Sequence, residues 1–231
     1  RSPNPMATLT FRFAGESGEG VISAGEIYTL ALSDIGFNVF TFESYPAEIK
    51  GGHAKIQVRV ADKNILLSRG DGVDVLLAFN KEAYDRHYKD LKVGGVLVFD
   101  NTDFLPDEDT RTIKYPVPFN KIAMEEIGVR LTKNMVSLGS LSELFGVPQD
   151  KLKELIRDKF SKKGEAVLEK NFKALEAGAK YVKENLKKQD KVQVQPTGRQ
   201  PRLVLAGNEA LSLGAIAAGL RVYAGYPITP A

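Results

Sequence analysis

Two almost wholly apolar runs, at residues 73–79 and 96–99, constrain the fold of this chain more than any other feature. A strand without a polar face is buried on both sides, which is the usual state of parallel strands between two layers of helices. Parallel neighbours need a long crossover, and residues 81–91 can form the connecting helix. Further strands are expected at residues 8–14, 37–42 and 54–61. The sequence therefore predicts an α/β fold, a three-layer and mostly parallel sheet with helices on both faces.

The chain after residue 118 has the composition of a helical extension. Helices are expected at residues 119–127, 132–145 and 148–160, and Gly128 and Gly146 are their end signals. A longer helix follows, because apolar residues alternate steps of four and three and so share one stripe. The stripe consists of Leu168, Phe172, Leu175, Ala179, Val182 and Leu186. Only Gly178 weakens this helix, at a cost of about 1 kcal/mol relative to alanine.

The last 44 residues are expected to form a linker and the beginning of a second domain. Residues 188–201 contain few large apolar side chains and are rich in Lys, Gln and Pro, which is typical of a linker. A strand at 202–206, a small-residue helix at 208–220 and a strand at 222–224 follow. A β-α-β unit of this size cannot cover its own sheet, so we expect a second α/β domain that is cut short.

Composition excludes several classes of site. Cysteine is absent, which excludes a cysteine-ligated iron–sulfur cluster, a thiolate zinc site and a cysteine nucleophile within these 231 residues. The net charge of +3 gives no argument for a nucleic-acid partner. The basic residues of 150–200 could face an anion, but the solvated side of an amphipathic helix explains them better. No apolar stretch approaches the roughly 20 residues that span a bilayer, and no secretory leader is visible, so a cytoplasmic protein is expected.

A glycine-dense turn, Gly15-Glu16-Ser17-Gly18-Glu19-Gly20, separates the first expected strand from the first helix. Successive backbone N–H groups and the helix dipole make such a turn a natural anion site. A tight strand-to-helix turn without a ligand explains Gly15, Gly18 and Gly20 equally well.

A dinucleotide-binding fingerprint is an alternative interpretation of the same turn. Gly18-x-Gly20-x-x-Ser23 is close to that pattern, and Glu43 lies near the place of the acid that binds the ribose. Serine stands where the fingerprint has glycine or alanine. The two glutamates of the turn would also place negative charge beside a pyrophosphate, which counts against this interpretation.

Residues 45–53 join the second and third strands and contain Lys50, Gly51 and Gly52. Paired glycines allow a close backbone approach, and the lysine could contact a phosphate or a carboxylate. His53 precedes a strand and is interpreted as a structural, hydrogen-bonded residue rather than a catalytic one. His87 lies in a charged helical stretch and is expected to be exposed.

Near the end of the chain, Tyr226-Pro227-Ile228-Thr229-Pro230 is the most informative segment. Two prolines fix φ on either side of Thr229, which would hold its hydroxyl in a stiff loop after a strand. Open α/β sheets bind ligands at that end of a strand. A proline-rich turn with an incidental threonine remains the alternative.

These motifs together resemble the 2-oxoacid:ferredoxin oxidoreductases. Gly207-Asn208-Glu209-Ala210 and residues 226–230 resemble the opening of their pyrimidine-binding (α-type) domain. Residues 15–25 and 45–53 resemble their γ-type domain, with Ser17 and Lys50 where relatives often have glycine and arginine. The order of the two domains is similar to fused α subunits of the 2-oxoglutarate branch. The resemblance implies a γ-type domain at 7–187, a linker at 188–201 and the start of the α-type domain at 202–231.

The resemblance implies thiamine diphosphate chemistry, in which a 2-oxoacid is decarboxylated, electrons pass to ferredoxin and the acyl group passes to coenzyme A. A partner β subunit would hold the diphosphate, Mg²⁺ and an iron–sulfur cluster. Thr229 would orient the substrate carboxylate, and Tyr226, Pro227 and Ile228 would contact the cofactor. Gly15, Gly18 and Gly20 would contribute to coenzyme A capture together with Lys50, Gly51 and Gly52.

Three hypotheses follow from the sequence. The first is part of an oxidoreductase α subunit that acts on 2-oxoglutarate and is inactive alone, because the glutamate that activates the thiamine and the β partner are missing. The second is a non-catalytic module for subunit assembly, for which the apolar stripe between residues 168 and 182 would be the docking surface. The third is a NAD-type protein that uses Gly18, Gly20 and Glu43.

Overall fold

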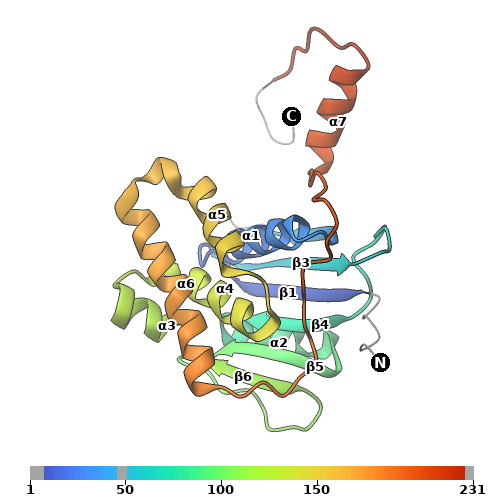
Figure 1. Ribbon diagram of the computed structural model, residues 1–231. Helices are drawn as coiled ribbons and strands as arrows, with labels where there is room; N and C mark the ends of the chain where they lie inside the picture. Colours follow the sequence, from blue (N-terminus) through green and yellow to red (C-terminus); the bar gives the residue numbers. More distant parts are fainter. Residues whose placement is uncertain (1–7, 46–50, 227–231) are drawn as a thin grey trace.

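A six-stranded mixed sheet forms the centre of the molecule (Figure 1). The structure is a computed structural model that describes residues 8–45 and 51–226. Its strands are β1 (Leu9–Glu16), β2 (Asn38–Ser44), β3 (His53–Ala61), β4 (Val73–Ala78), β5 (Leu91–Asp100) and β6 (Ile113–Val117). They lie side by side in the order β2-β3-β1-β4-β5-β6. Strand β3 is antiparallel to β1 and β2, whereas all other pairs are parallel, so β3 alone among the described strands opposes the common direction.

Helices cover both faces of this sheet, as predicted (Figure 1). One face is packed by α1 (Val21–Asp34), α3 (Phe119–Ile122), α4 (Lys133–Phe145), α5 (Gln149–Phe160) and α6 (Glu165–Asn185). The other face is packed by the shorter helix α2 (Lys81–His87). Side chains alternate along each strand, so Phe11 and Phe13 enter the larger core and Ala14 enters the smaller one.

Capping residues and glycines end the helices where the sequence indicates. The side chain of Asn80 accepts a hydrogen bond from Ala83 N at 2.8 Å and so begins α2. Helix α3 continues into a π-helical turn (Ala123–Ile127) that ends at Gly128, and α4 ends at Gly146. Both glycines have positive φ, 76° and 87°, which side chains other than glycine rarely adopt. Strand β6 has no counterpart among the expected strands.

The apolar stripe of the long helix α6 is buried inside the molecule. Leu168, Leu175, Ala179 and Val182 are at most 5% exposed and belong to the core between α6 and α4. The stripe therefore cannot serve as the docking surface of an assembly module, because α4 already covers it.

Helices α4 and α6 approach each other at two glycines. A Cβ at Gly178 would lie 2.0 Å from the carbonyl oxygen of Val136, and one at Gly139 would lie 1.8 Å from that of Leu175. The Oγ of Ser140 donates to the carbonyl of Val136 at 2.9 Å and lies 3.3 Å from that of Gly178. Gly178 thus weakens the helix locally but permits the contact of two backbones.

The segment expected to be a linker, residues 188–201, packs against the α/β domain that precedes it. Val192 and Val194 are buried, and Val194 N donates to the carbonyl of Phe145 at 2.8 Å. Further along, Thr197 N donates to the carbonyl of Ile35 at 2.9 Å. The segment has neither helix nor strand, but backbone hydrogen bonds attach it to the ends of α4 and α1.

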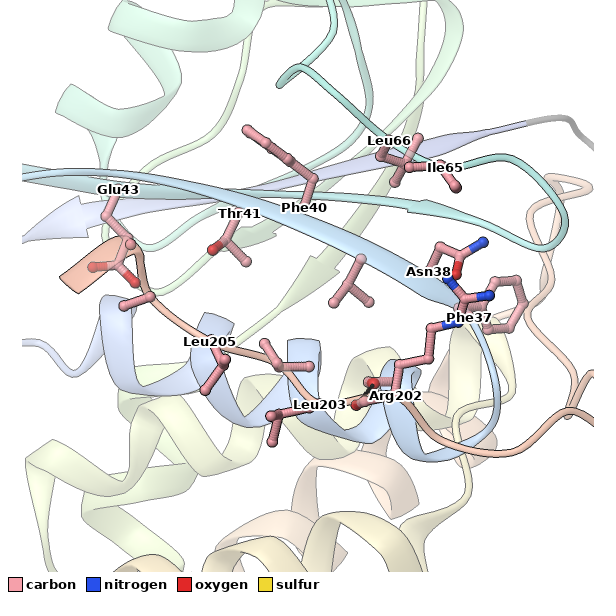
Figure 2. A pocket seen from close by; sticks show the side chains of 15 residues that line it. Phe37, Asn38, Phe40, Thr41, Glu43, Ile65, Leu66, Arg202, Leu203 and Leu205 are labelled. Atoms are coloured by element: carbon pink, nitrogen blue, oxygen red, sulfur yellow. Dashed lines mark hydrogen bonds between the residues drawn. The ribbon is translucent and has the colours of Figure 1, made fainter. Parts of the chain in front are cut away.

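The strands expected at residues 202–206 and 222–224 are not formed. Residues 202–206 run beside the edge strand β2 without pairing to it, and a cavity of about 640 Å³ lies between them (Figure 2). A strand needs a paired partner, and neither run pairs with a described strand. The expected helix is present as α7 (Gly207–Ala217), which projects away from the sheet and buries none of its side chains (Figure 1).

None of the helices in the described ranges combines the length and apolar composition needed to cross a membrane.

Candidate anion-binding site at the glycine-rich loop

The loop between β1 and α1 lies at the topological switch point of the sheet. From β1 the chain continues through α1 to β2 at one edge, and from β4 it continues through α2 to β5 on the other side. The two helices pack on opposite faces, so the switch point lies at the carboxyl ends of β1 and β4. Ligands of open α/β sheets bind at such a point.

The geometry of this loop explains why three of its positions are glycine. Gly18 and Gly20 have φ of 96° and 78°, in the left-handed region. A Cβ at Gly15 would lie 2.7 Å from Glu19 Oε2, and one at Gly20 would lie 2.3 Å from Asn134 Nδ2. The tight turn predicted from the sequence is therefore confirmed, and it directs the first N–H groups of α1 out of the sheet.

Glu19 is turned inward and neutralised. Its Oε2 accepts hydrogen bonds from Glu16 N at 2.7 Å and Asn80 Nδ2 at 3.2 Å, and its Oε1 accepts one from Lys133 Nζ. Lys133 is fully buried, and its ammonium also lies 5.4 Å from the centre of the Phe79 ring. The charge of Glu19 is therefore balanced by Lys133, whereas Glu16, the other glutamate of the turn, is exposed and lines the neighbouring cavity.

Lys133 is a residue that the sequence patterns did not single out. It is 114 positions from Glu19 in the sequence, and no local pattern connects the two. One signal was available: a lysine in the first turn of a helix, next to apolar Met135 and Val136, is unfavourable beside the positive end of the helix dipole. A cation in that position needs an acidic partner.

A cavity of about 410 Å³ opens at the loop, between the start of α1 and the end of α5. Its lining includes one carboxylate, that of Glu16, together with Gly18, Gly20, Val21, Ile22, Ser23, Leu131, Phe160, Lys159 and Lys163. The hydroxyl of Ser23, in the first turn of α1, is buried without a hydrogen-bond partner within the described ranges. Lys159 pairs with Glu26 at 2.5 Å, whereas Lys163 forms no ion pair with any described residue. Backbone donors, the ammonium of Lys163 over the Phe160 ring, the Glu16 carboxylate and apolar walls thus meet in one place.

The second glycine segment lies beside the first. Gly51 and Gly52 have φ of 74° and 80°, and the carbonyl of Gly52 accepts a hydrogen bond from Ser17 N at 2.8 Å. Lys50 is outside the described residues. The structure therefore brings the two predicted glycine segments together and leaves the role of Lys50 a prediction.

The strand order contradicts the interpretation of this loop as a dinucleotide-binding fingerprint. Glu43 lies at the end of β2, and β3 separates β2 from β1, so this carboxylate is two strand positions from the glycine loop. It accepts a hydrogen bond from Tyr45 Oη at 2.5 Å instead. The close contact of helix and sheet occurs at Gly25, where a Cβ would lie 2.2 Å from Ile56 Cγ2, and not at Ser23.

Of the residues expected to contact thiamine diphosphate, Pro227, Ile228 and Thr229 lie outside the described residues. Tyr226 is 77% exposed, beyond the end of α7. Their roles stay predictions.

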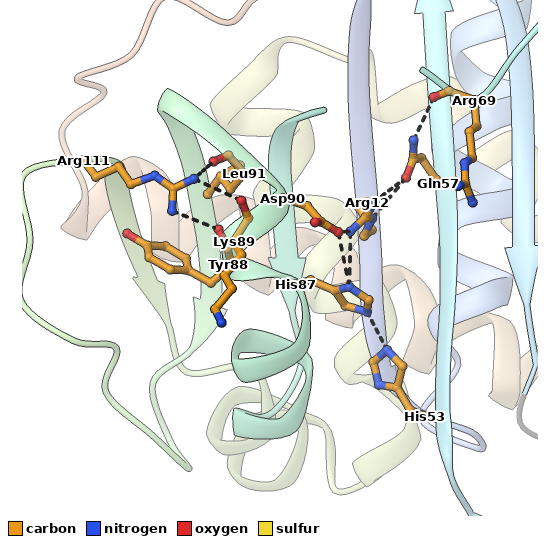
Figure 3. Close-up of polar contacts among 10 residues, drawn as sticks. All are labelled: Arg12, His53, Gln57, Arg69, His87, Tyr88, Lys89, Asp90, Leu91 and Arg111. Carbon is orange, nitrogen blue, oxygen red and sulfur yellow. Dashed lines mark hydrogen bonds and ion pairs between the residues drawn. The ribbon is translucent and has the colours of Figure 1, made fainter. Parts of the chain in front are cut away.

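His87 is buried and not exposed as expected (Figure 3). Helix α2 turns this side chain toward a row of polar side chains on the sheet, which local sequence did not reveal. Its Nδ1 lies 3.2 Å from an Nη of Arg12, and its Nε2 lies 2.6 Å from Nε2 of His53. Burial, with Arg12 nearby, lowers the pKa of His87 to about 3, and burial also lowers the pKa of His53. Both imidazoles are therefore neutral at pH 7.

This pair predicts a loss of stability in mild acid. In the unfolded chain His87 takes up a proton below the ordinary histidine pKa of 6.5, whereas in the folded protein it does so only near pH 3, so stability falls between these values. The contribution amounts to at most about 2 kcal/mol between pH 6.5 and 5. Denaturant titrations at both pH values should show a smaller drop for His87→Gln, which retains an acceptor and a donor. An equal drop in both proteins would contradict this assignment.

Together, the fold and the loop define an α/β domain with a glycine-rich strand-to-helix loop at its switch point. Residues 10–181 match the family described as pyruvate ferredoxin/flavodoxin oxidoreductase. The chain is 30% identical over 262 residues to the 2-oxoglutarate oxidoreductase subunit KorA of Mycobacterium tuberculosis, covering 98% of this chain and 40% of KorA. It is 35% identical over 180 residues to the 2-oxoglutarate synthase subunit KorC of Methanocaldococcus jannaschii, covering 75% of this chain and 93% of KorC. The chain belongs to this oxidoreductase family.

Solved structures agree with this assignment. The 2-oxoglutarate:ferredoxin oxidoreductase from Magnetococcus marinus, which holds 2-oxoglutarate, coenzyme A and succinyl-CoA, matches 99% of this chain with a TM-score of 0.87 and 41% identity. The match covers 40% of that chain. The γ subunit of a keto/oxoacid ferredoxin oxidoreductase from Geobacter sulfurreducens matches 76% of this chain and 99% of its own, with a TM-score of 0.64 and 29% identity. The chain thus spans about 40% of the length of its longer relatives.

Proposed function

We propose that this chain is part of the α subunit of a 2-oxoglutarate:ferredoxin oxidoreductase. The reaction is the oxidative decarboxylation of the oxoacid, with transfer of the acyl group to coenzyme A and of electrons to ferredoxin. The proposal is supported by the match to the Magnetococcus enzyme along 99% of the chain, including residues after the first lobe. The γ-type lobe would occupy residues 7–187, and residues 202–231 would begin the α-type lobe.

The cavity at the glycine loop is proposed to receive coenzyme A. Its backbone N–H groups and the ammonium of Lys163 suit phosphate groups, and its walls of Ile22, Leu131 and Phe160 suit the less polar pantetheine chain. The buried hydroxyl of Ser23 offers a further hydrogen bond. This combination of an anion loop with an apolar cavity is the observation that carries the proposal.

The thiamine chemistry is assigned to residues 226–230 together with a partner β subunit. We propose that Thr229 donates a hydrogen bond that orients the substrate carboxylate, and that Tyr226, Pro227 and Ile228 contact the pyrimidine side of the cofactor. Thiamine diphosphate would stabilise the carbanion formed on decarboxylation. The diphosphate, Mg²⁺ and the iron–sulfur cluster are assigned to the partner, in line with a chain that has no cysteine. The chain alone should therefore show no turnover.

Isothermal titration with coenzyme A tests the proposed cavity. Lys163→Gln is expected to weaken binding about tenfold, because a charge-assisted hydrogen bond contributes about 1.5 kcal/mol. Lys162→Gln is the matched control, since this neighbour does not line the cavity. Lys50→Ala should also weaken binding. Equal affinities for the two glutamine variants would contradict the assignment.

The same titration separates the alternatives. A pure assembly module would co-purify with a β partner but would not bind coenzyme A, and a NAD-type protein would bind NADH. We expect coenzyme A binding, co-purification with the partner and no NADH binding.

A further inference from the structure

A second cavity, of about 550 Å³, opens on the opposite face of the sheet. Its polar lining comes from Ser44 at the end of β2, His53 and Lys55 on β3, and Glu82, Arg86 and His87 on α2. Side chains of a strand alternate between faces, so His53 and Lys55 face away from Ala54, which lines the cavity of the glycine loop. None of the described residues lines both cavities. The second cavity is therefore separate from the proposed coenzyme A site.

Lys55 carries the unbalanced charge of this cavity. Arg86 pairs with Glu82 at 2.8 Å, and Arg12, behind the cavity, pairs with Asp90. Lys55 is half-buried, and no carboxylate or other hydrogen-bond partner reaches its ammonium from the described parts of the chain. Burial, with Arg12 nearby, lowers the pKa of Lys55, and the more distant charge of Asp90 offsets this only in part.

The two histidines cannot balance or add to that charge. Arginine only donates hydrogen bonds, so Nδ1 of His87 accepts from Arg12, and its proton lies on Nε2. That proton is donated to Nε2 of His53 at 2.6 Å, which places the proton of His53 on Nδ1. A proton added to either ring would break this chain of donors. Both imidazoles therefore remain neutral, and Glu82, the only carboxylate among the described residues that line the cavity, is engaged by Arg86.

The cavity thus offers donors and one uncompensated cation to whatever enters it. The hydroxyl of Ser44 makes no hydrogen bond to another described residue, and the ammonium of Lys55 has three N–H donors. Several donors around one position suit a phosphate, whose oxygens diverge, better than a planar carboxylate. The volume exceeds that of a free phosphate ion, so the group has room to carry an organic substituent.

We propose that this cavity binds the phosphate group of a phosphorylated ligand, with Lys55 as its charged contact and Arg86 as a second contact on the rim. The proposal does not depend on coenzyme A binding at the glycine loop.

Titration of the 231-residue chain with inorganic phosphate and with AMP tests the proposed phosphate site. Adenosine, which lacks the phosphate, is the uncharged control ligand. We expect wild-type protein to bind phosphate or AMP but not adenosine, and Lys55→Gln to weaken that binding at least tenfold. Tighter binding of AMP than of phosphate would identify a phosphate ester as the ligand, and equal binding would identify the free ion. Lys89→Gln, a neighbouring exposed lysine outside the cavity, should bind as the wild type does.

The variants also keep this test independent of the proposed function. Lys163→Gln should retain phosphate binding here while it weakens coenzyme A at the other cavity. Thermal unfolding without ligand checks the fold of Lys55→Gln, which should be at least as stable as the wild type because a half-buried unpaired charge is removed. The proposal is overturned if wild-type protein binds neither probe, if Lys55→Gln binds them as the wild type does, or if Lys163→Gln removes the binding.

Discussion

Replacement of Lys133 by methionine is expected to lower the free energy of unfolding by about 3 kcal/mol or more, because it leaves the Glu19 carboxylate unpaired. Methionine has a similar length and can occupy the apolar surroundings of the lysine stem, so lost packing contributes little. Glu19 retains Glu16 N and Asn80 Nδ2 as donors, but neither carries a charge. Urea unfolding, followed by circular dichroism, measures this loss.

A double-mutant cycle separates the ion pair from simple packing. Glu19→Gln alone should be at least as destabilising, since it leaves the fully buried ammonium of Lys133 without a counter-charge. The double variant Lys133→Met, Glu19→Gln should recover much of the loss, because no buried charge is left without a partner. Additive losses in the double variant would show that the two residues act independently.

The ion pair also connects the core to the proposed ligand site. Glu19 accepts the N–H of Glu16 and so fixes the conformation in which the loop presents its other backbone donors. Lys133→Met should therefore weaken coenzyme A binding as well as the fold, although Lys133 does not line the cavity.

Gly178→Ala is expected to destabilise the protein by more than about 3 kcal/mol, as severe overpacking of a core can. The new Cβ would lie 2.0 Å from the carbonyl oxygen of Val136 and 2.8 Å from its carbonyl carbon. These are backbone atoms within α4, so they cannot rotate away, and the two helices must separate. Urea unfolding of the variant gives the magnitude.

The direction of the stability change in Gly178→Ala distinguishes close helix packing from helix propensity. Helix propensity alone predicts that alanine at position 178 stabilises α6 by about 1 kcal/mol. Gly214→Ala in α7 is the matched control, since that glycine is helical and a Cβ there would meet nothing within 4 Å. We expect no loss of stability for Gly214→Ala. A stabilised Gly178→Ala protein would contradict the close approach of the two helices.

Local sequence was sufficient where one element carries its own signal. The apolar runs at 73–79 and 96–99 are the buried strands β4 and β5, and the stripe from Leu168 to Val182 is the buried face of α6. Gly18 and Gly20 of the first loop are recognisable because a positive φ favours glycine in the sequence, and Gly15 because the turn leaves no room for a Cβ. Resemblance to a family supplied the function, which no spacing of residues in this chain would have given.

Local sequence failed where a partner lies far along the chain. The neighbours of His87 in the sequence predict an exposed side chain. Arg12 and His53, which contact it, come from strands β1 and β3. Glu43 is expected beside the glycine loop, because nothing in the sequence shows that β3 inserts between β1 and β2. The runs at 202–206 and 222–224 have strand-like composition, but neither forms hydrogen-bonded pairs with a described strand.

The sequence by itself determined the layered α/β class, the turn that exposes the start of α1 and the long helix α6, because each rests on periodicity or on the conformational freedom of glycine. Only the tertiary structure decided the strand order, the pairing of Glu19 with Lys133, the crossing of α4 and α6 at Gly178, and the neutral histidine pair. The physical reason is range: these features depend on charges and backbone surfaces that become neighbours only after the chain has folded.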